Sequence, residues 1–196
     1  MDIKKTANLF IDFATKRLAE ISGFILFFLG LALFIALFTY SPEDPNFIFP
    51  DNKEINNFFG FKGSFVSDLF FQSVGLVAYL ISLTFIITGI NLLRSKEFIL
   101  IIENIFFVVL YSIFGTLFLT HYYSDAFTLY INGNGGFIGS FLNQTYLNKI
   151  LLKNSQFAYY FLIILILFLF LKSINFNLFK LYELILKYLS FFKKKK

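Results

Sequence analysis

The chain has 196 residues, of which 58% are hydrophobic, 22% aromatic and only 15% charged, and it carries a formal net charge of +5. This composition excludes an ordinary soluble domain, because polar groups are too few to cover the surface of such a chain. We therefore predict an all-α, polytopic membrane protein with four transmembrane helices. The sequence has no cysteine, which excludes disulfides and thiolate metal sites.

The N-terminal region is predicted to begin with an amphipathic helix over residues 1–20. Apolar residues recur at three- and four-residue spacing from Ile3 to Ile21, opposite a basic face, as in a helix that lies on the inner leaflet. The first membrane span follows over 21–39. Thirteen of the residues in 21–38 are Leu, Ile or Phe, and they favour insertion by roughly 4 to 8 kcal/mol.

The first span ends in the stretch TYSPEDPNF. Tyr40 suits the depth of the membrane interface, and Ser41 can cap a turn that tolerates Pro42 at its first position. Asp44 stands three residues after Ser41, as the acidic residue does in a capping box, and Pro45 prevents the helix from continuing. We interpret the stretch as a helix stop that faces outward and shapes the first loop against the second span.

Three further apolar runs are long enough to cross the bilayer as helices, at about 69–93, 98–120 and 157–174. Asp68 stands at the expected start of the second span, where a helix N-terminus favours a carboxylate. Small residues on the first three spans favour close helix packing. Ala158 is the one such residue in the apolar part of the fourth span, so we predict that this span is the most lipid-exposed.

Basic residues predict the orientation of the four spans. Thirteen of the seventeen Lys and Arg residues fall in the segments 1–20, 94–97 and 172–196, and basic segments are retained on the cytoplasmic face. Both termini are therefore expected to be inside. The end of the chain, 175–196, is predicted to be a basic amphipathic helix on the inner leaflet. The whole chain is thus one membrane-anchor domain built around the four-span unit 21–174.

Few residues in the spans are candidates for chemistry. Glu103 lies about one turn into the third span, where its side chain can reach towards Arg94 and Lys96. His121 is the only histidine, and one histidine without a cysteine cannot supply a standard zinc site, so we interpret it as part of an aromatic belt. We expect no catalytic residue, no metal site and no cofactor site in this chain.

The segment NGNGGFIGS invites comparison with phosphate-binding loops. It lacks the lysine of a Walker A loop, and its glycines do not have the spacing of a dinucleotide-binding fingerprint. We interpret it as a turn that leads into a short helix near 137–147, resting on the membrane surface.

A small transport or channel subunit is the alternative interpretation of the chain. Its helices would line a pathway, which needs polar side chains at mid-depth on facing helices. The candidates for such side chains are Gln72, Ser82, Thr84, Thr88, Ser112 and Thr116.

The order of these features resembles the membrane domain of FtsK/SpoIIIE-type DNA translocases. Residues 17–47 are similar to the first span of that family with its Tyr-Ser-Pro-x-Asp-Pro exit. Residues 56–81 are similar to its Gly-x-x-x-x-Asp-Leu helix start and Gln-x-x-Gly second span, and residues 134–142 resemble its glycine-rich segment before the last span. The resemblance covers nearly the whole chain and implies the N-terminal four-helix membrane domain of the family.

The resemblance also implies a function. In that family a linker and a RecA-like motor follow, and the motor assembles as a hexamer and pumps double-stranded DNA. The membrane domain would tether the motor at the division septum of the bacterial inner membrane, in contact with the lipid bilayer, with further copies of itself and with other division proteins. ATP, Mg²⁺ and DNA would be bound only by the motor. Since this chain has no Walker A or Walker B segment, we expect a fragment or a truncated member that cannot hydrolyse ATP.

The positions that carry the resemblance are expected to serve structure and interaction. None of them is expected to be catalytic. They are Tyr40, Ser41, Pro42, Asp44, Pro45, Asp68, Gln72, Gly75, Gly135, Gly136 and Gly139.

Overall fold

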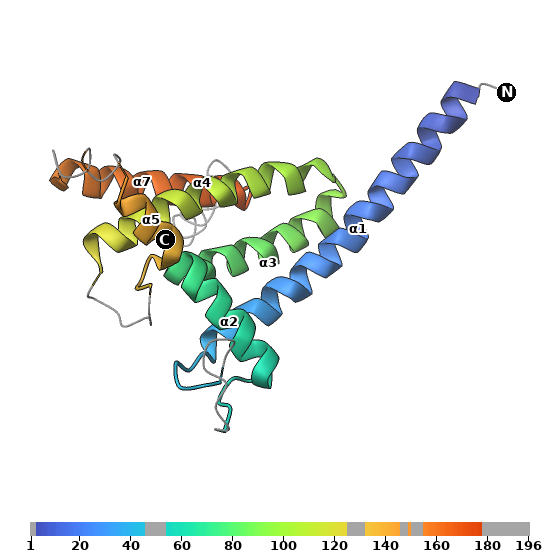
Figure 1. Ribbon diagram of the computed structural model, residues 1–196. Coiled ribbons are helices and arrows are strands. Elements are labelled where there is room, and N and C mark those ends of the chain that lie inside the picture. Colours follow the sequence, from blue (N-terminus) through green and yellow to red (C-terminus); the bar gives the residue numbers. More distant parts are fainter. Residues whose placement is uncertain (1–2, 46–53, 125–131, 146–148, 150–154, 178–196) are drawn as a thin grey trace, which may run out of the picture.

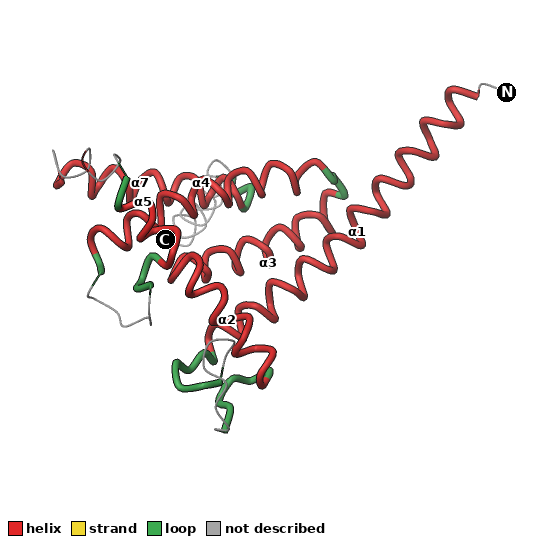
Figure 2. Tube along the Cα trace, in the orientation of Figure 1, coloured by secondary structure: helices red, strands yellow, loops and turns green. Residues whose placement is uncertain are grey.

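The computed structural model describes residues 3–45, 54–124, 132–145, 149 and 155–177. In this part of the chain every regular element is a helix, which confirms the all-α prediction (Figure 2). The elements are α1 (Ile3–Phe38), α2 (Gly60–Val74), the 3-10 helix η1 (Gly75–Val77), α3 (Ala78–Ser95), α4 (Ile99–Tyr122), α5 (Gly136–Asn143) and α7 (Ser155–Ser173).

Four stretches are long and apolar enough to cross a membrane, as predicted. Two pairs of helices form the bundle: α1 lies along α3, and α4 lies along α7 (Figure 1). Helix α3 also contacts α4 and α7 and so joins the two pairs, while α2 and α5 pack against each other at one end. The four stretches are Ala7–Phe38, Gly60–Ser95, Ile99–Tyr122 and Ser155–Ser173.

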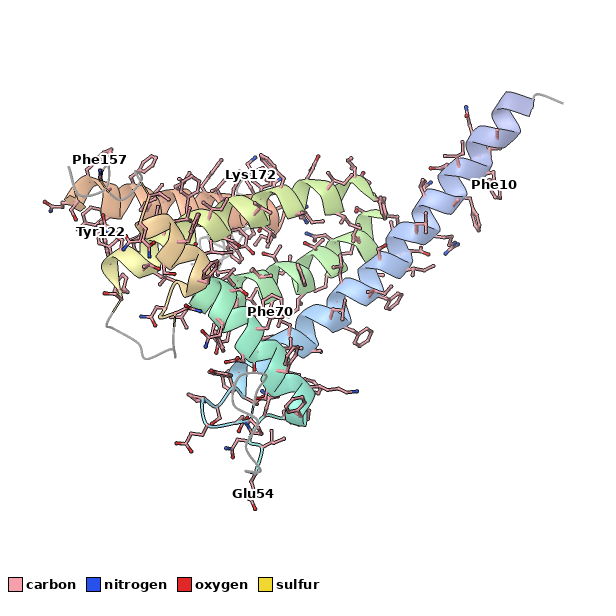
Figure 3. The ribbon with its side chains drawn as sticks, in the orientation of Figure 1. Phe10, Glu54, Phe70, Tyr122, Phe157 and Lys172 are labelled. Atoms are coloured by element: carbon pink, nitrogen blue, oxygen red, sulfur yellow. The ribbon has the colours of Figure 1, made fainter. Side chains whose placement is uncertain are left out.

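Helix α1 joins the predicted amphipathic segment and the first span into one rod. Its 36 residues correspond to about 54 Å at 1.5 Å per residue, which exceeds the roughly 30 Å of hydrocarbon in a bilayer. The expected boundary between residues 20 and 21 is therefore not a break in the helix. The N-terminal part projects beyond the other helices, and Phe10 on it is 72% exposed (Figures 1 and 3).

The second span differs most from its predicted bounds. Its helix begins at Gly60 and not near 69, and it is interrupted by η1 before it continues as α3. The reason for the interruption is Gly75, whose φ of 61° lies in the left-handed region that favours glycine. An apolar run does not reveal such a change of direction, so α2 was not distinguished from α3 in the sequence.

Glycines allow α1 and α3 to approach closely. A Cβ atom placed on Gly30 would lie 2.7 Å from the Ile86 backbone nitrogen, and one placed on Gly89 would lie 2.6 Å from the Phe27 backbone nitrogen. Such positions hold no side chain, so the two backbones pack against each other, as small residues permit in membrane bundles.

The helices differ in how deeply they are buried. The core cluster is centred on fully buried side chains such as Leu37 of α1, Ala78 of α3 and Tyr111 of α4. In the most apolar window of each span, 11% of residues are buried for the fourth span, against 22% for the third and 44% for the second. This confirms the prediction that the fourth span is the most exposed.

Candidate functional site

The predicted site residues gather at two places joined by α2. The first, which we call the α1–α2 junction, comprises residues 39–45 after α1 and residues 54–68 before and within α2. The second, the glycine junction, comprises residues 72–75 at the end of α2 and residues 132–139 at the start of α5. The sequence predicted that the exit stretch would lie against the second span, but it did not indicate the contact that forms the glycine junction.

Asp44 is the centre of the α1–α2 junction. It is 2% exposed, and its carboxylate accepts hydrogen bonds from the backbone N–H groups of Asn56 at 2.8 Å and Asn57 at 2.9 Å. The capping-box prediction is wrong, because the carboxylate binds these later N–H groups and does not reach back to Ser41. The turn is closed instead by the Asp44 N–H, which donates to the Ser41 carbonyl at 3.2 Å.

Further polar bonds attach the loop to both helices. The Asn57 side-chain amide donates to the Ala36 carbonyl at 2.9 Å, and the Thr39 hydroxyl accepts the Phe58 N–H at 3.1 Å. The Ser64 hydroxyl of α2 donates to the Pro45 carbonyl at 3.1 Å. The end of the first span is therefore fixed against the start of α2, which confirms that the exit stretch shapes the loop against the second span.

Asp68 takes part in the same junction from the middle of α2. The residue is 5% exposed, and its carboxylate accepts a hydrogen bond from the Tyr40 hydroxyl at 3.2 Å. The Tyr40 ring also packs on Phe71, with ring centroids 4.8 Å apart. The predicted place of Asp68 at a helix N-terminus is wrong, because α2 begins eight residues earlier at Gly60. A buried carboxylate needs hydrogen-bond donors, and Tyr40 supplies one.

The glycine junction brings two chain segments into direct backbone contact. The Leu76 N–H donates to the Asn134 carbonyl at 2.9 Å. A Cβ atom on Gly75 would lie 1.9 Å from that carbonyl oxygen, and one on Gly136 would lie 2.7 Å from the Ser73 oxygen. Gly75 and Gly136 also have φ values of 61° and 65°. Neither position can accept a side chain without moving the backbone.

Two more predicted glycines seat α5 on the end of α4. Cβ atoms on Gly135 and Gly139 would lie 2.3 Å and 2.5 Å from the Thr116 carbonyl oxygen. Thr116, a candidate for the transport pathway, lies on the third span, whose small residues were predicted to favour close packing, and it packs against α5. The short helix predicted near 137–147 is confirmed, although it ends earlier, at Asn143.

Amide side chains complete the glycine junction. The Asn132 side-chain amide donates to the Gln72 side-chain carbonyl at 3.1 Å. Asn134 is 1% exposed, and its side-chain amide donates to the Tyr123 carbonyl at the end of α4. Gln72 of the candidate list is thus a packing residue that ties α2 to the segment before α5.

A buried polar network between α3, α4 and α7 was not predicted. The Thr84 hydroxyl lies 3.0 Å from the Tyr111 hydroxyl and 3.2 Å from the Ser173 hydroxyl. One helical turn away, the Asn104 amide donates to the Thr88 hydroxyl at 2.8 Å. Thr84 and Thr88 were candidates for a transport pathway, and in the structure both are occupied by bonds between helices. The four-residue spacing of Thr84 and Thr88 indicates a polar face on one helix. It does not reveal their hydrogen-bond partners, because these lie on other spans.

The network also ties the end of α7 to the rest of the bundle. The Asn175 side-chain amide donates to the Asn104 side-chain carbonyl at 2.9 Å, and the Asn91 amide donates to the Ile174 carbonyl at 2.9 Å. The exit of α7 therefore lies beside the end of α3.

Glu103 and Lys96 do not form the pair that the sequence suggested. Lys96 bonds Glu20 of α1 at 2.7 Å, whereas Glu103 is exposed and has no ion pair within the residues that the structure describes. His121 packs edge-on against Tyr122, with ring centroids 4.5 Å apart, in a cluster with other aromatic rings. The contacts place His121 among aromatic rings, and its position in a belt at the membrane interface stays a prediction.

The two ends of the α4–α7 pair differ in character. Tyr122 and Phe157 mark the aromatic end, and Lys172 lies towards the opposite one (Figure 3). No group of three or more His, Cys, Asp or Glu residues that could hold a metal ion occurs in the described ranges. The four apolar helices and the two junctions thus define a polytopic helical membrane domain, in which the described polar side chains mainly join one segment to another.

The chain belongs to the family described as the 4TM region of DNA translocase FtsK/SpoIIIE, which it matches over residues 15–186. The resemblance found in the sequence is thereby confirmed. The match contains the four predicted spans, from residue 21 to residue 174, and both junctions.

Individual relatives match over part of their own length. The DNA translocase FtsK of Rickettsia typhi is 31% identical over 133 residues, which are 65% of this chain and 18% of that protein. The DNA translocase FtsK of Azospirillum brasilense is 36% identical over 87 residues, 43% of this chain and 14% of that protein. The chain thus spans less than a fifth of each of these relatives. No solved structure matches it significantly.

Proposed function

We propose that this chain is the membrane-anchoring and septum-targeting domain of a DNA translocase that acts in cell division and chromosome segregation. The observation that carries the proposal is the family match over residues 15–186. It is supported by relatives named DNA translocase FtsK, of which the chain covers only 18% and 14%. In this proposal the chain itself catalyses no reaction, and ATP, Mg²⁺ and DNA are bound by a motor outside the aligned part.

The proposed orientation has both termini on the cytoplasmic side of the bacterial inner membrane. Where the structure describes them, the ends of the basic segments next to the spans lie near one another, which supports the proposal. Lys96 in the turn between α3 and α4 bonds Glu20 of α1, and the Asn91 amide near the end of α3 bonds the Ile174 carbonyl after α7. The start of the first span and the exit of the fourth therefore lie at the same end as that turn.

The proposed partners are further copies of the chain, as in a hexamer, and other division proteins. The α1–α2 junction then faces the outer side of the membrane. Glu43 and Glu54 are exposed there, and Figure 3 shows Glu54 at the far end of the junction. Hydrogen bonds fix residues 39–45 against residues 54–64, and a pre-ordered surface lowers the entropy cost of binding a partner.

A fluorescent fusion of residues 1–196, imaged in dividing cells, tests the proposal. We expect signal enriched at division sites, with the fusion recovered in the membrane fraction. A fusion that is recovered in membranes but spreads evenly over the envelope would contradict septum targeting. A fusion that stays in the soluble fraction would contradict membrane anchoring.

A further inference from the structure

A groove with apolar walls runs between α1, α2 and α3. Its volume is about 430 Å³, and one charged side chain, Lys62, lies at its edge. Phe70 of α2 contributes to the wall where α2 comes close to α1 and α3 (Figure 3). The remaining wall residues that matter here are Leu29, Ala32, Ala36 and Phe85.

Small residues on α1 leave this groove open, and the groove runs along that helix. Ala32 and Ala36 stand one turn apart on α1, and both line the groove. From Ala36 to Leu29 the wall follows α1 for about 10 Å at 1.5 Å per residue. Lys62 lies at the end near the α1–α2 junction, and Leu29 and Phe85 line the deeper part. The groove therefore runs from the end of the first span towards the middle of the membrane.

Lys62 has the properties of a headgroup contact. It is exposed, and the described residues give it no ion pair. The two buried carboxylates of the junction are already used, because Asp44 binds two backbone N–H groups and Asp68 accepts the Tyr40 hydroxyl. A lysine at the membrane interface can lay its stem on apolar surface while the ammonium group stays at headgroup level.

We propose that the groove binds one anionic phospholipid of the leaflet in which α1 ends, with an acyl chain along Ala32 and Ala36 and the phosphate on Lys62. Such a lipid matches both features of the site, since hydrocarbon fills the apolar part and the phosphate pairs with the ammonium group. An apolar helix of a second copy would fill the walls but would bury the Lys62 ammonium group against apolar surface, which is costly.

Native mass spectrometry of the purified chain tests this site. The protein is incubated with phosphatidylglycerol or with phosphatidylcholine, and bound lipids are counted. We expect one retained phosphatidylglycerol. Lys62→Gln should lower its occupancy roughly fivefold, the effect of one lysine at an anionic surface, and Ala32→Phe should abolish retention by filling the groove.

Matched controls separate this site from general effects. Lys149→Gln removes another exposed lysine, and Leu167→Phe adds bulk to a different groove between α4 and α7. Both controls should retain the lipid. Equal retention of the two lipids, equal retention by Lys62→Gln, or a dimer that forms without lipid and is lost in Ala32→Phe would each overturn the proposal. Lys62 is exposed, so its variant stays folded and keeps the test decisive even where Ala32→Phe does not fold.

Discussion

The two junctions on α2 hold distant segments together in opposite ways. At the glycine junction the segments touch through their backbones, because Gly75 and Gly136 carry no side chain. At the α1–α2 junction polar side chains bridge the gap, with Asp44 binding the backbone of the loop and Tyr40 binding Asp68. One added atom disrupts a whole backbone contact, whereas a single substitution removes only some of the hydrogen bonds in a set. We therefore expect larger effects at the glycine junction.

The largest effect is expected for Gly75→Ala. The new Cβ atom would lie 1.9 Å from the Asn134 carbonyl oxygen at a φ of 61°, and backbone strain with overpacking should cost roughly 3 to 5 kcal/mol. Thermal unfolding in detergent micelles measures it. Gly60→Ala is the matched control, because Gly60 has a φ of 62° but open space around it, so only the conformational cost of roughly 1 to 2 kcal/mol applies. Equal losses in the two variants would contradict the backbone contact.

The next effect is expected for Asp44→Ala. It removes the acceptor of two backbone N–H groups in a buried position, and the loss of these charge-assisted bonds should cost roughly 2 to 3 kcal/mol. Limited proteolysis of the loop should become faster, and the unfolding temperature should fall. Glu43→Ala changes the exposed neighbour and should stay within about 0.5 kcal/mol of the wild type. An unchanged cleavage rate for Asp44→Ala would rule out its bridging role.

A double-mutant cycle on Tyr40→Phe and Asp68→Asn separates one bond from the rest of the junction. The hydroxyl of Tyr40 lies 3.2 Å from the Asp68 carboxylate, and a coupling free energy of roughly 1 to 2 kcal/mol is expected for a hydrogen bond to a charged group. The cycle needs the unfolding free energies of four proteins, which are the wild type, the two single variants and the double variant. Additive losses would show that the two residues act separately.

The smallest effect is expected in the polar network between the spans. Thr84→Val removes the hydroxyl that lies between Tyr111 and Ser173, and interhelical hydrogen bonds in membranes contribute about 0.6 kcal/mol on average. Thr15→Val is the control, since the exposed Thr15 hydroxyl bonds only within its own helix, to the Ile11 and Asp12 carbonyls. If Thr84→Val lowered the free energy of unfolding as much as Gly75→Ala, the expected ranking of the regions would be wrong.

Much of the fold followed from local features of the sequence. The four spans were predicted because length and apolarity are properties of one continuous segment, and the exposure of the fourth span followed from its lack of small residues. The glycine-rich segment was predicted as a turn and a short helix, and the structure agrees. The interruption after Gly75 was missed, because an apolar run has the same composition whether its helix is straight or broken.

The candidate residues were identified more reliably than their partners. Asp44 and Asp68 were each assigned to a helix end nearby in sequence, and both assignments were wrong, because a buried carboxylate binds whichever donors the fold brings to it. Asn104 was not singled out at all, and one of the two residues that bond it, Asn175, is 71 positions away. Spacing along one helix reveals a polar face but not the helix opposite.

The sequence by itself determined that this chain is a four-span helical membrane domain, and it marked the exit stretch and the glycines as special positions. The reason is that insertion into hydrocarbon depends on each segment alone. Only the tertiary structure decided that Gly75 meets Asn134, that Asp44 holds the loop before α2 and that Lys62 borders a groove. These contacts join segments that are far apart in the chain, so they exist only once the helices have packed.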